Sequence, residues 1–444
     1  MGLPGARHNY AMRFALAIAA SVLGACTLAE SAPAALTVEP PVRLDRSSSG
    51  SPQLSDAFIN YSVMAWRNAN SVKVARWFKG AGPTTRTLAT NAVSGQTIAV
   101  SAGSSRAVVA WRTKSGLRFA MSGKEGVFGS RSIAIPGSSR GTSVAITWPS
   151  YSRWTSSGGS VVISWVAPTG CGTAAKAISY NPIRRSFDGP LRTLSPKCGH
   201  AAMLRASSHA IAWRSGTSTG GYSIVARAVG SKGTIGRLRT VSRHRVIGFA
   251  PSVADTYQGA MIAWRDRVSG DVRGSKGKVM LGEVLRNGRE TSVKPISFSD
   301  RIVGRPTLAS NGNDFVLATW QQGGLSPVVM QAAGQSLLGF SDPQVISRCG
   351  AYDATGSNPA AAISNRSNAT VFQTACMGEL GGSSDYGAAL VTQRAGNAWD
   401  PAVALSSAGY ARNPAIVASW DGYLATWVQD GSRGGLMASR ITGE

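Results

Sequence analysis

The chain has 444 residues, a formal net charge of +25 at pH 7 and a hydrophobic content of 43%. This hydrophobic content is enough to bury a core, which excludes a chain that is disordered throughout. Turn-forming clusters rich in Gly separate short runs of Val, Ile, Trp and Ala, a pattern that favours many short strands over long helices. The positive charge suits polyanionic surroundings, but the basic residues stand singly, and we expect no specific nucleic-acid binding.

Residues 1–25 are predicted to be a signal peptide. Arg13 precedes an apolar stretch, 14–25, that is too short to span a bilayer and has the length of a signal-peptide core. The stretch runs into Leu23-Gly24-Ala25-Cys26, which resembles the bacterial lipobox, whose Cys becomes the lipid-modified first residue of the mature protein. Cleavage at Ala32-Pro33-Ala34 is the alternative. We therefore expect an extracytoplasmic protein, either secreted or held at the membrane by a lipid on Cys26.

From residue 54 to the C-terminus one pattern recurs, in which a β-rich run leads to an aromatic residue that we call the anchor. Successive anchors lie 45 to 56 residues apart. The anchors are Trp66, Trp111, Trp165, Trp213, Trp264, Trp320, Phe372 and Trp427. Four short antiparallel strands can be traced around each anchor, which predicts one blade of a β-propeller per repeat. We interpret the anchors as buried wedges between adjacent sheets rather than as a series that stacks on a ligand.

Within each repeat the first strand often begins with Pro, and the anchor lies on the second strand. First strands are expected at 251–255, 306–310 and 414–418. Third strands are expected at 72–78, 222–228, 328–333 and 389–395. Fourth strands are expected at 191–196, 238–243, 343–348 and 401–407.

The last repeat has room after Trp427 only for a third strand, at 434–441. We predict its missing fourth strand at 36–44, inside an N-terminal segment that covers 26–53. Such a strand would close the ring and remove the exposed edges. The prediction is therefore an all-β protein in which 54–444 form a β-propeller of eight four-stranded blades closed by an N-terminal strand. Seven blades with one irregular unit, or two smaller domains, are the alternatives.

Four of the five cysteines form two pairs with the same separation of 27 residues, Cys171 with Cys198 and Cys349 with Cys376. Cys171 and Cys376 each follow an anchor closely, where the second strand of the repeat turns into the third. The other two lie in links between blades, and in a propeller both kinds of loop emerge on one face. We expect two disulfides in an oxidising compartment, which leaves Cys26 for lipidation.

The residues directly after the anchors are the candidate binding site, and we call them the post-anchor residues. They are Arg67, Arg112, Arg214, Arg265, Gln321 and Gln373. Together they would form a positively charged surface for an anionic glycan or envelope polymer, because guanidinium groups pair bidentately with carboxylate, sulfate and phosphate. The alternative is that each Arg stacks on a nearby ring or pairs with a local carboxylate such as Asp266.

An insertion in the third repeat carries Trp148, Tyr151 and Trp154, which would offer a platform for sugar rings or else pack back onto the blade.

The sequence gives little support for an enzyme. Zinc and calcium patterns such as HExxH, CxxC and DxDxDG are missing from the sequence, and we expect neither a metal nor a cofactor. Two GxSxG strings, 137–141 and 216–220, lie in Gly/Ser-rich turns with no helix to follow. The 21 acidic residues include no pair that stands out as glycosidase carboxylates.

The Pro-initiated first strands, the Ala-Trp endings of the second strands and the segment WDPAVALSS (399–407) resemble the bacterial sialidase-like propellers of the BNR-repeat type. The resemblance covers nearly the whole mature chain. The Asp-box of that family, Ser-x-Asp-x-Gly-x-x-Trp, is not matched in any repeat, and its catalytic Arg and Tyr residues cannot be placed. The resemblance therefore implies the fold and not the activity.

We accordingly expect a monomeric, non-enzymatic propeller that recognises an envelope polymer, a glycan or another protein through one face. A glycan-active hydrolase or lyase on a degenerate sialidase-like scaffold is one alternative. A structural assembly module is the other.

Overall fold

The computed structural model describes residues 37–442, apart from the following segments. These are 47–51, 57–60, 79, 95–96, 104, 150–158, 197, 217–220, 231, 243–249, 268–276, 290–292, 298–302, 313–314, 324–326, 336–338, 350–351, 354, 365–366, 376–386, 395–399, 401, 407–409, 420 and 432–433. The predicted signal peptide and Cys26 lie outside the described residues. Residues 35–444 form one compact unit. In the part of the chain that is described, no helix has the length and apolar character needed to cross a membrane.

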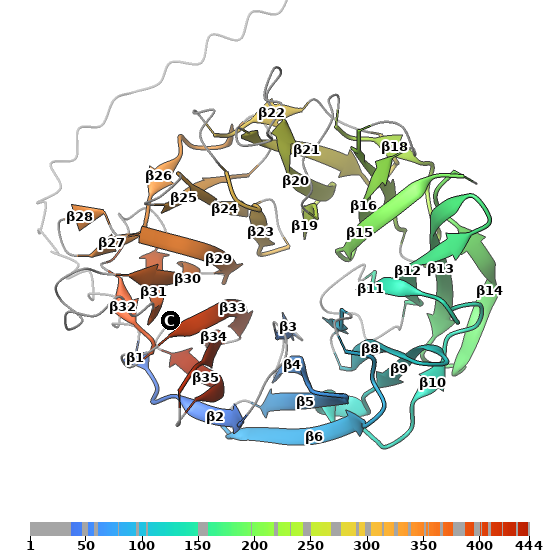
Figure 1. Cartoon of the computed structure of the whole chain (residues 1–444), viewed down its shortest axis with the longest axis horizontal. Coiled ribbons are helices and arrows are strands. Elements are labelled where there is room, and N and C mark those ends of the chain that lie inside the picture. The colour runs from blue at the N-terminus through green and yellow to red at the C-terminus, as the bar shows by residue number, and fades with distance from the viewer. Residues whose placement is uncertain are drawn as a thin grey trace, which may run out of the picture. The chain divides into compact units, whose positions relative to one another are not determined.

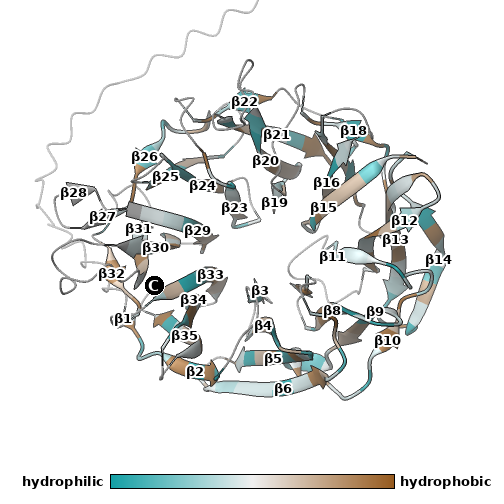
Figure 2. Ribbon diagram, viewed as in Figure 1, coloured by the Kyte–Doolittle hydropathy of each residue, from teal (hydrophilic) through white to brown (hydrophobic). Residues whose placement is uncertain are grey.

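Antiparallel sheets follow one another around a common centre, as Figure 1 shows. We number the repeat units 1 to 8 by their anchors in chain order, from Trp66 to Trp427. In each unit the first strand lies nearest the centre and the last lies farthest out. The outermost strand of unit 1 is mostly exposed and carries mainly pale and polar colours in Figure 2.

Units 1 to 4 have these strands. Unit 1 contains β3 (Gln53–Asp56), β4 (Tyr61–Asn68), β5 (Ser71–Phe78) and β6 (Pro83–Ala89). Unit 2 contains β7 (Ala99–Ala102), β8 (Ala107–Thr113), β9 (Gly116–Met121), the short helix η1 (Lys124–Gly126) and β10 (Ile133–Ala134). Unit 3 contains β11 (Thr142–Thr147), β12 (Val161–Thr169), β13 (Gly172–Asn181) and β14 (Ser186–Thr193). Unit 4 contains β15 (His200–Ala206), β16 (Ala210–Gly216), β17 (Ser223–Ala228) and β18 (Arg239–Thr240).

Units 5 to 8 continue the series. Unit 5 contains β19 (Ser252–Asp255), β20 (Gly259–Arg267), β21 (Gly277–Leu285) and β22 (Lys294–Pro295). Unit 6 contains β23 (Thr307–Ser310), β24 (Val316–Gln322), β25 (Val328–Gly334) and β26 (Gln344–Val345), and the hairpin β27 (Arg348–Cys349) and β28 (Tyr352–Asp353) follows it. Unit 7 contains β29 (Thr355–Ile363), β30 (Ser367–Ala375), β31 (Gly387–Arg394) and β32 (Val403–Ala404). Unit 8 contains β33 (Ala411–Ser419), β34 (Gly422–Gln429) and β35 (Gly435–Thr442), joined by β1 (Thr37–Val38) and β2 (Val42–Asp45).

Units 1, 2, 5, 6 and 7 each form a four-stranded sheet with the strands in chain order. Units 3 and 4 share one eight-stranded sheet, in which the parallel pair Thr173↔His200 links their strands. The all-β prediction is confirmed, and eight blades remain our interpretation of this arrangement.

The sheet of unit 8 is completed by strands from the start of the chain. Val42 and Arg43 of β2 pair with Ala438 and Met437 of β35, and β1 pairs with the end of the same strand. The prediction of a closing N-terminal strand is confirmed, but the single strand expected at 36–44 is two short strands. Pro40-Pro41 lies between them, and proline lacks the N–H that a continuous ladder needs.

The anchors form the core between neighbouring units, and each of the eight is at most 1% exposed. Trp111 of unit 2 packs with Val63 and Ala65 of unit 1. Trp66 of unit 1 packs with Val428 and Leu436 of unit 8, on the other side of the seam between the chain's ends. The wedge interpretation is therefore confirmed, and it holds across the closing sheet as well.

Three of the four fourth strands expected from the sequence are shorter than predicted, whereas β14 (Ser186–Thr193) is longer than the predicted run 191–196. β18, β26 and β32 have two residues each, where runs of six or seven were expected. Each of the three runs leaves the ladder early, because a Ser inside the run, two residues after the end of the strand, turns inward and its hydroxyl accepts a backbone N–H from the third strand. Ser347 Oγ accepts the N–H of Val329 in this way at 2.9 Å. The same bond is made by Ser138, Ser195, Ser242, Ser297 and Ser406.

Candidate functional site

A pocket of about 350 Å³ is lined mainly by residues on or beside the first strands of units 1, 6, 7 and 8, and we call it the central pocket. These strands are the innermost ones in Figure 1. The polar residues in its lining are Gln53, Arg305, Thr307, Gln321, Asn358 and Asn413. The remainder of the lining is apolar, namely three prolines, two alanines, Leu54 and Ile416.

Three of the polar lining residues directly precede a proline that lies on a first strand or just before it. Arg305-Pro306, Asn358-Pro359 and Asn413-Pro414 repeat this arrangement in three successive units. Proline cannot donate to the ladder, and the pairing of β29 and β33 shifts register at the Asn-Pro steps. Asn358 and Asn413 have φ values of 48° and 51°, a left-handed conformation that Asn tolerates better than most residues.

Several hydrogen bonds orient the lining. The Nδ2 of Asn358 donates to Oε1 of Gln373 at 3.1 Å. The hydroxyl of Thr307 donates to the carbonyl of Pro359 at 3.2 Å, which connects unit 6 to unit 7 beside the pocket. Asn358 and Asn413 both line the pocket, and their side-chain amides offer further donors and acceptors to a ligand with hydroxyl groups.

Arg305 brings a positive charge to the central pocket. Arg305 is exposed in the pocket, yet the protein atoms around it keep bulk water from its charge and lower its pKa. Arg205, on β15 of unit 4, is half-buried, and its Nη1 donates to the carbonyl of Leu204 at 2.8 Å. Burial, and then repulsion from Arg305, lowers the pKa of Arg205 to about 10. Among the described residues, neither arginine has a carboxylate partner.

Two of the post-anchor arginines contact the link that leads to the next unit. Arg67 is buried, and its Nη1 donates to the carbonyl of Val93 at 3.3 Å. Arg112 is half-buried and donates to the carbonyl of Gly141. Both side chains therefore hold neighbouring units together through backbone acceptors.

The other four post-anchor residues divide between local packing and the central pocket. The guanidinium of Arg214 lies 3.9 Å from the ring centroid of Tyr222, and Arg265 is buried. Gln321 lines the central pocket, and Gln373 holds Asn358 at its edge. Two members of the predicted set thus lie at the pocket, which the sequence interpretation did not locate.

No protein-family model and no curated protein sequence matches this chain. Among solved structures, a propeller named Dos1 is similar with a TM-score of 0.54 and 11% identity, covering 92% of this chain and 95% of the other. The BP39L lectin from Burkholderia pseudomallei is similar with a TM-score of 0.52 and 14% identity, covering 82% of this chain and 100% of the lectin. The protein is a β-propeller. At such low identity, the likeness extends to the fold alone.

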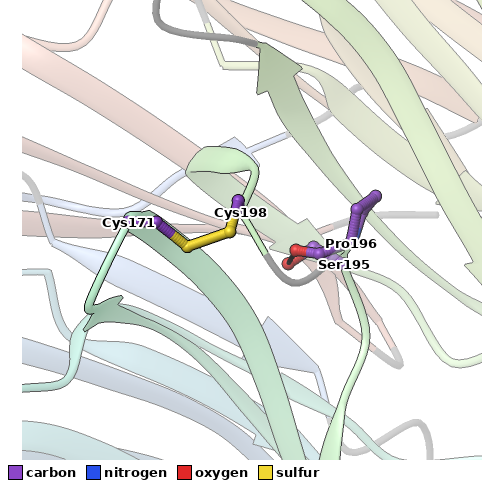
Figure 3. The surroundings of a disulfide bond; sticks show 4 residues. All are labelled: Cys171, Ser195, Pro196 and Cys198. Carbon is purple, nitrogen blue, oxygen red and sulfur yellow. Dashed lines mark hydrogen bonds between the residues drawn. A yellow bond between two sulfur atoms is a disulfide. The ribbon is translucent and has the colours of Figure 1, made fainter.

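One predicted disulfide of the propeller is formed, and Figure 3 shows its surroundings. Cys171 lies in the turn between β12 and β13, Cys198 lies in the link to β15, and their Cα atoms are 5.1 Å apart. The side chains of the second predicted pair, Cys349 and Cys376, lie outside the described residues.

The predicted aromatic platform of the propeller is described only in part. Trp148 is buried, and its indole packs against Gly103, where an added Cβ would lie 3.1 Å from the ring. Tyr151 and Trp154 lie outside the described residues. Trp148 therefore packs on its neighbouring unit, as the alternative interpretation expected.

His209 and Asp255 form a His–carboxylate pair of the kind found in some active sites, and here it connects two neighbouring units. His209 Nδ1 lies 3.1 Å from Oδ1 of Asp255, and the same carboxylate accepts the backbone N–H of Ser208 at 2.9 Å. Burial raises the pKa of Asp255, but the hydrogen bond and charge of His209 and further hydrogen bonds outweigh it, so the pKa is lowered. The carboxylate thereby fastens the β15–β16 hairpin of unit 4 to unit 5. Within the described ranges, no cluster of three His, Cys, Asp or Glu side chains could hold a metal ion.

Proposed function

We propose that this propeller is an extracytoplasmic, non-enzymatic binding protein that holds a glycan or another envelope polymer in its central pocket. The observation that carries the proposal is the lining of the pocket, in which amide, hydroxyl and guanidinium groups from several units converge. Its volume of about 350 Å³ lies within the ordinary range of ligand sites, roughly 300–1,000 Å³.

Side-chain amides suit a ligand rich in hydroxyl groups. Gln53, Gln321, Asn358 and Asn413 each carry both donors and an acceptor, and a sugar hydroxyl needs one of each. A glycosidase would instead need two positioned carboxylates. The described lining residues include no carboxylate, which favours binding over hydrolysis.

The location of the protein is part of the proposal. The disulfide between Cys171 and Cys198 supports an oxidising compartment, because such bonds persist mainly outside the cytoplasm. A signal peptide over 1–25 would deliver the chain there, with a lipid on Cys26 or release after cleavage. We propose a monomer without a cofactor.

A binding screen of the full chain against envelope glycans tests this function. Asn413→Gly should weaken any glycan that binds by about 3- to 10-fold, the range expected for one lost neutral hydrogen bond. Glycine keeps the positive φ of this position, so the variant removes the amide and retains the backbone. Asn287→Gly, in the turn after β21, is the matched control and should bind like the wild type. Failure to bind any glycan, or equal binding by wild type and Asn413→Gly, would contradict the proposal.

A further inference from the structure

Arg305 is the charged residue in the described lining of the central pocket. It directly precedes Pro306, which lies just before β23 and lacks the N–H that would extend the ladder. Its side chain is exposed, and no hydrogen bond or ion pair with another described residue occupies its guanidinium. Asn358, Asn413 and Gln321 line the same pocket and add hydrogen-bond donors beside it.

No carboxylate among the described residues neutralises Arg305. The surrounding protein atoms partly desolvate its guanidinium and lower its pKa. An anion that approaches such a charge gains a charge-assisted hydrogen bond and restores the lost solvation. Arg305 is therefore the group in the described lining that can select the charge of a ligand.

We propose that the central pocket binds an oxyanion of an acidic polysaccharide, with Arg305 as the direct contact. This inference rests on the proposed function and adds the charge class of the ligand. The planar guanidinium of Arg305 pairs with two oxygens of one carboxylate or sulfate, and the amides of Asn358 and Asn413 bind the neighbouring hydroxyl groups.

The test uses the full chain with three polymers, namely dextran, dextran sulfate and polygalacturonate. Dextran and dextran sulfate share a backbone, so their comparison isolates the charge, and polygalacturonate distinguishes carboxylate from sulfate. Wild type should bind at least one acidic polymer more tightly than dextran, with a rise in melting temperature. Arg305→Gln should lose about 10- to 100-fold in affinity for that polymer, as expected for a charge-assisted hydrogen bond.

The control is Arg192→Gln on β14, which removes the same charge from an exposed site on an outer strand. It should change affinity less than 3-fold, roughly the scale of a screened surface charge. Without polymer, Arg305→Gln should melt close to the wild-type temperature, because Arg305 is exposed and makes no hydrogen bond or ion pair with another described residue. Arg305→Lys keeps the positive charge but loses the planar guanidinium that can bind two oxygens at once, so it should bind the acidic polymer with intermediate affinity. If Arg305→Gln does not fold, the affinity of Arg305→Lys is the test.

Three results would overturn the inference. Equal losses in Arg192→Gln and Arg305→Gln would mean that binding is spread over a basic surface. Unchanged binding in Arg305→Gln would remove the residue from the site. If the protein prefers a neutral glycan and Asn413→Gly weakens that binding, the proposed function stands and the acidic ligand is rejected. If the protein binds neither neutral nor acidic glycans, the proposed function and the acidic ligand are both rejected.

Discussion

Asp45, on the closing strand β2, is the polar residue that joins the start of the chain to unit 1. Its carboxylate accepts the indole N–H of Trp66 at 2.8 Å and the amide of Asn68 at 2.8 Å, and it pairs with Lys73 at 2.9 Å. The carboxylate is nearly buried, with 6% of the side chain exposed. The indole N–H of Trp66 in unit 1 is therefore bound by a residue from the adjoining sheet of unit 8.

Asp45→Asn should lower the free energy of unfolding at pH 7 by about 1–3 kcal/mol, because it weakens a buried, charge-assisted network. Burial raises the pKa of Asp45, but hydrogen bonds from Trp66, Lys73 and Asn68 and the charge of Lys73 lower it further. A carboxyl whose pKa is lower in the folded state stabilises above its unfolded pKa, and this stabilisation is lost as the pH falls through the folded value. Melting temperatures measured between about pH 6 and pH 3 should fall less steeply in the variant than in the wild type.

Asp430→Asn provides the comparison for that measurement. Asp430 pairs with Arg412 at 3.3 Å, and both side chains are more than two-fifths exposed. Solvent and salt screen such a pair, so its loss should cost less than about 1 kcal/mol. Equal losses at Asp45 and Asp430 would mean that the closing carboxylate contributes no more than a surface charge.

Prediction from the sequence succeeded for the residues whose roles repeat. The burial of Trp66 and its counterparts followed from their period alone, and the pairing of Cys171 with Cys198 followed from their positions relative to the anchors. Arg305, Asn358 and Asn413 were missed, although a polar residue before Pro in three successive repeats marks all of them. The partner of Arg67 could not have been read from the sequence, because a backbone carbonyl in a link has no residue signature.

At the scale of single elements, the inward-turning Ser decides where a fourth strand ends. The predicted run 343–348 has the composition of a strand, yet β26 covers only Gln344–Val345. Ile346 then packs into the core and Ser347 accepts the N–H of Val329. Strand propensity reports only the likelihood of an extended backbone and cannot detect a side chain that replaces the next ladder bond.

Ser347→Ala should destabilise the protein by about 1–3 kcal/mol, because the buried N–H of Val329 would lose its acceptor. Urea unfolding monitored by tryptophan fluorescence measures the change. Ser341→Ala is the control in the same unit, since Ser341 accepts the N–H of Ala333 at 3.2 Å in an exposed position where water can substitute. A loss at Ser341 as large as that at Ser347 would contradict the role of burial in this bond.

At the scale of the whole molecule, the ring depends on strands from both ends of the chain. The seam is held by the ladders of β1 and β2 with β35, by Asp45, and by the packing of Trp66 on Val428 and Leu436. Without the closing strands, β35 would present an exposed edge, which invites pairing with other chains. The sequence allowed this closure to be predicted because the last repeat lacked room for a fourth strand.

Deletion of residues 37–45 should therefore lower the melting temperature and increase self-association, as measured by differential scanning calorimetry and light scattering. A synthetic peptide of residues 37–46 added in excess should restore part of the lost stability by pairing with β35. The same peptide with Asn in place of Asp45 should restore less. A deletion variant that melts like the wild type and stays monomeric would show that the seam contributes little.

The seam between β2 and β35 also affects the order in which the chain can fold. Val42 and Ala438 are partners in one ladder although almost the entire chain separates them. A growing polypeptide can assemble unit 1 from neighbouring residues as soon as they are made, but β2 finds its partner only after the last strand has been synthesised. Contacts of such long sequence separation form slowly, since the entropy of closing the loop is lost before any contact compensates for it. We therefore expect closure to be a late step of folding, after the units built from neighbouring residues have formed.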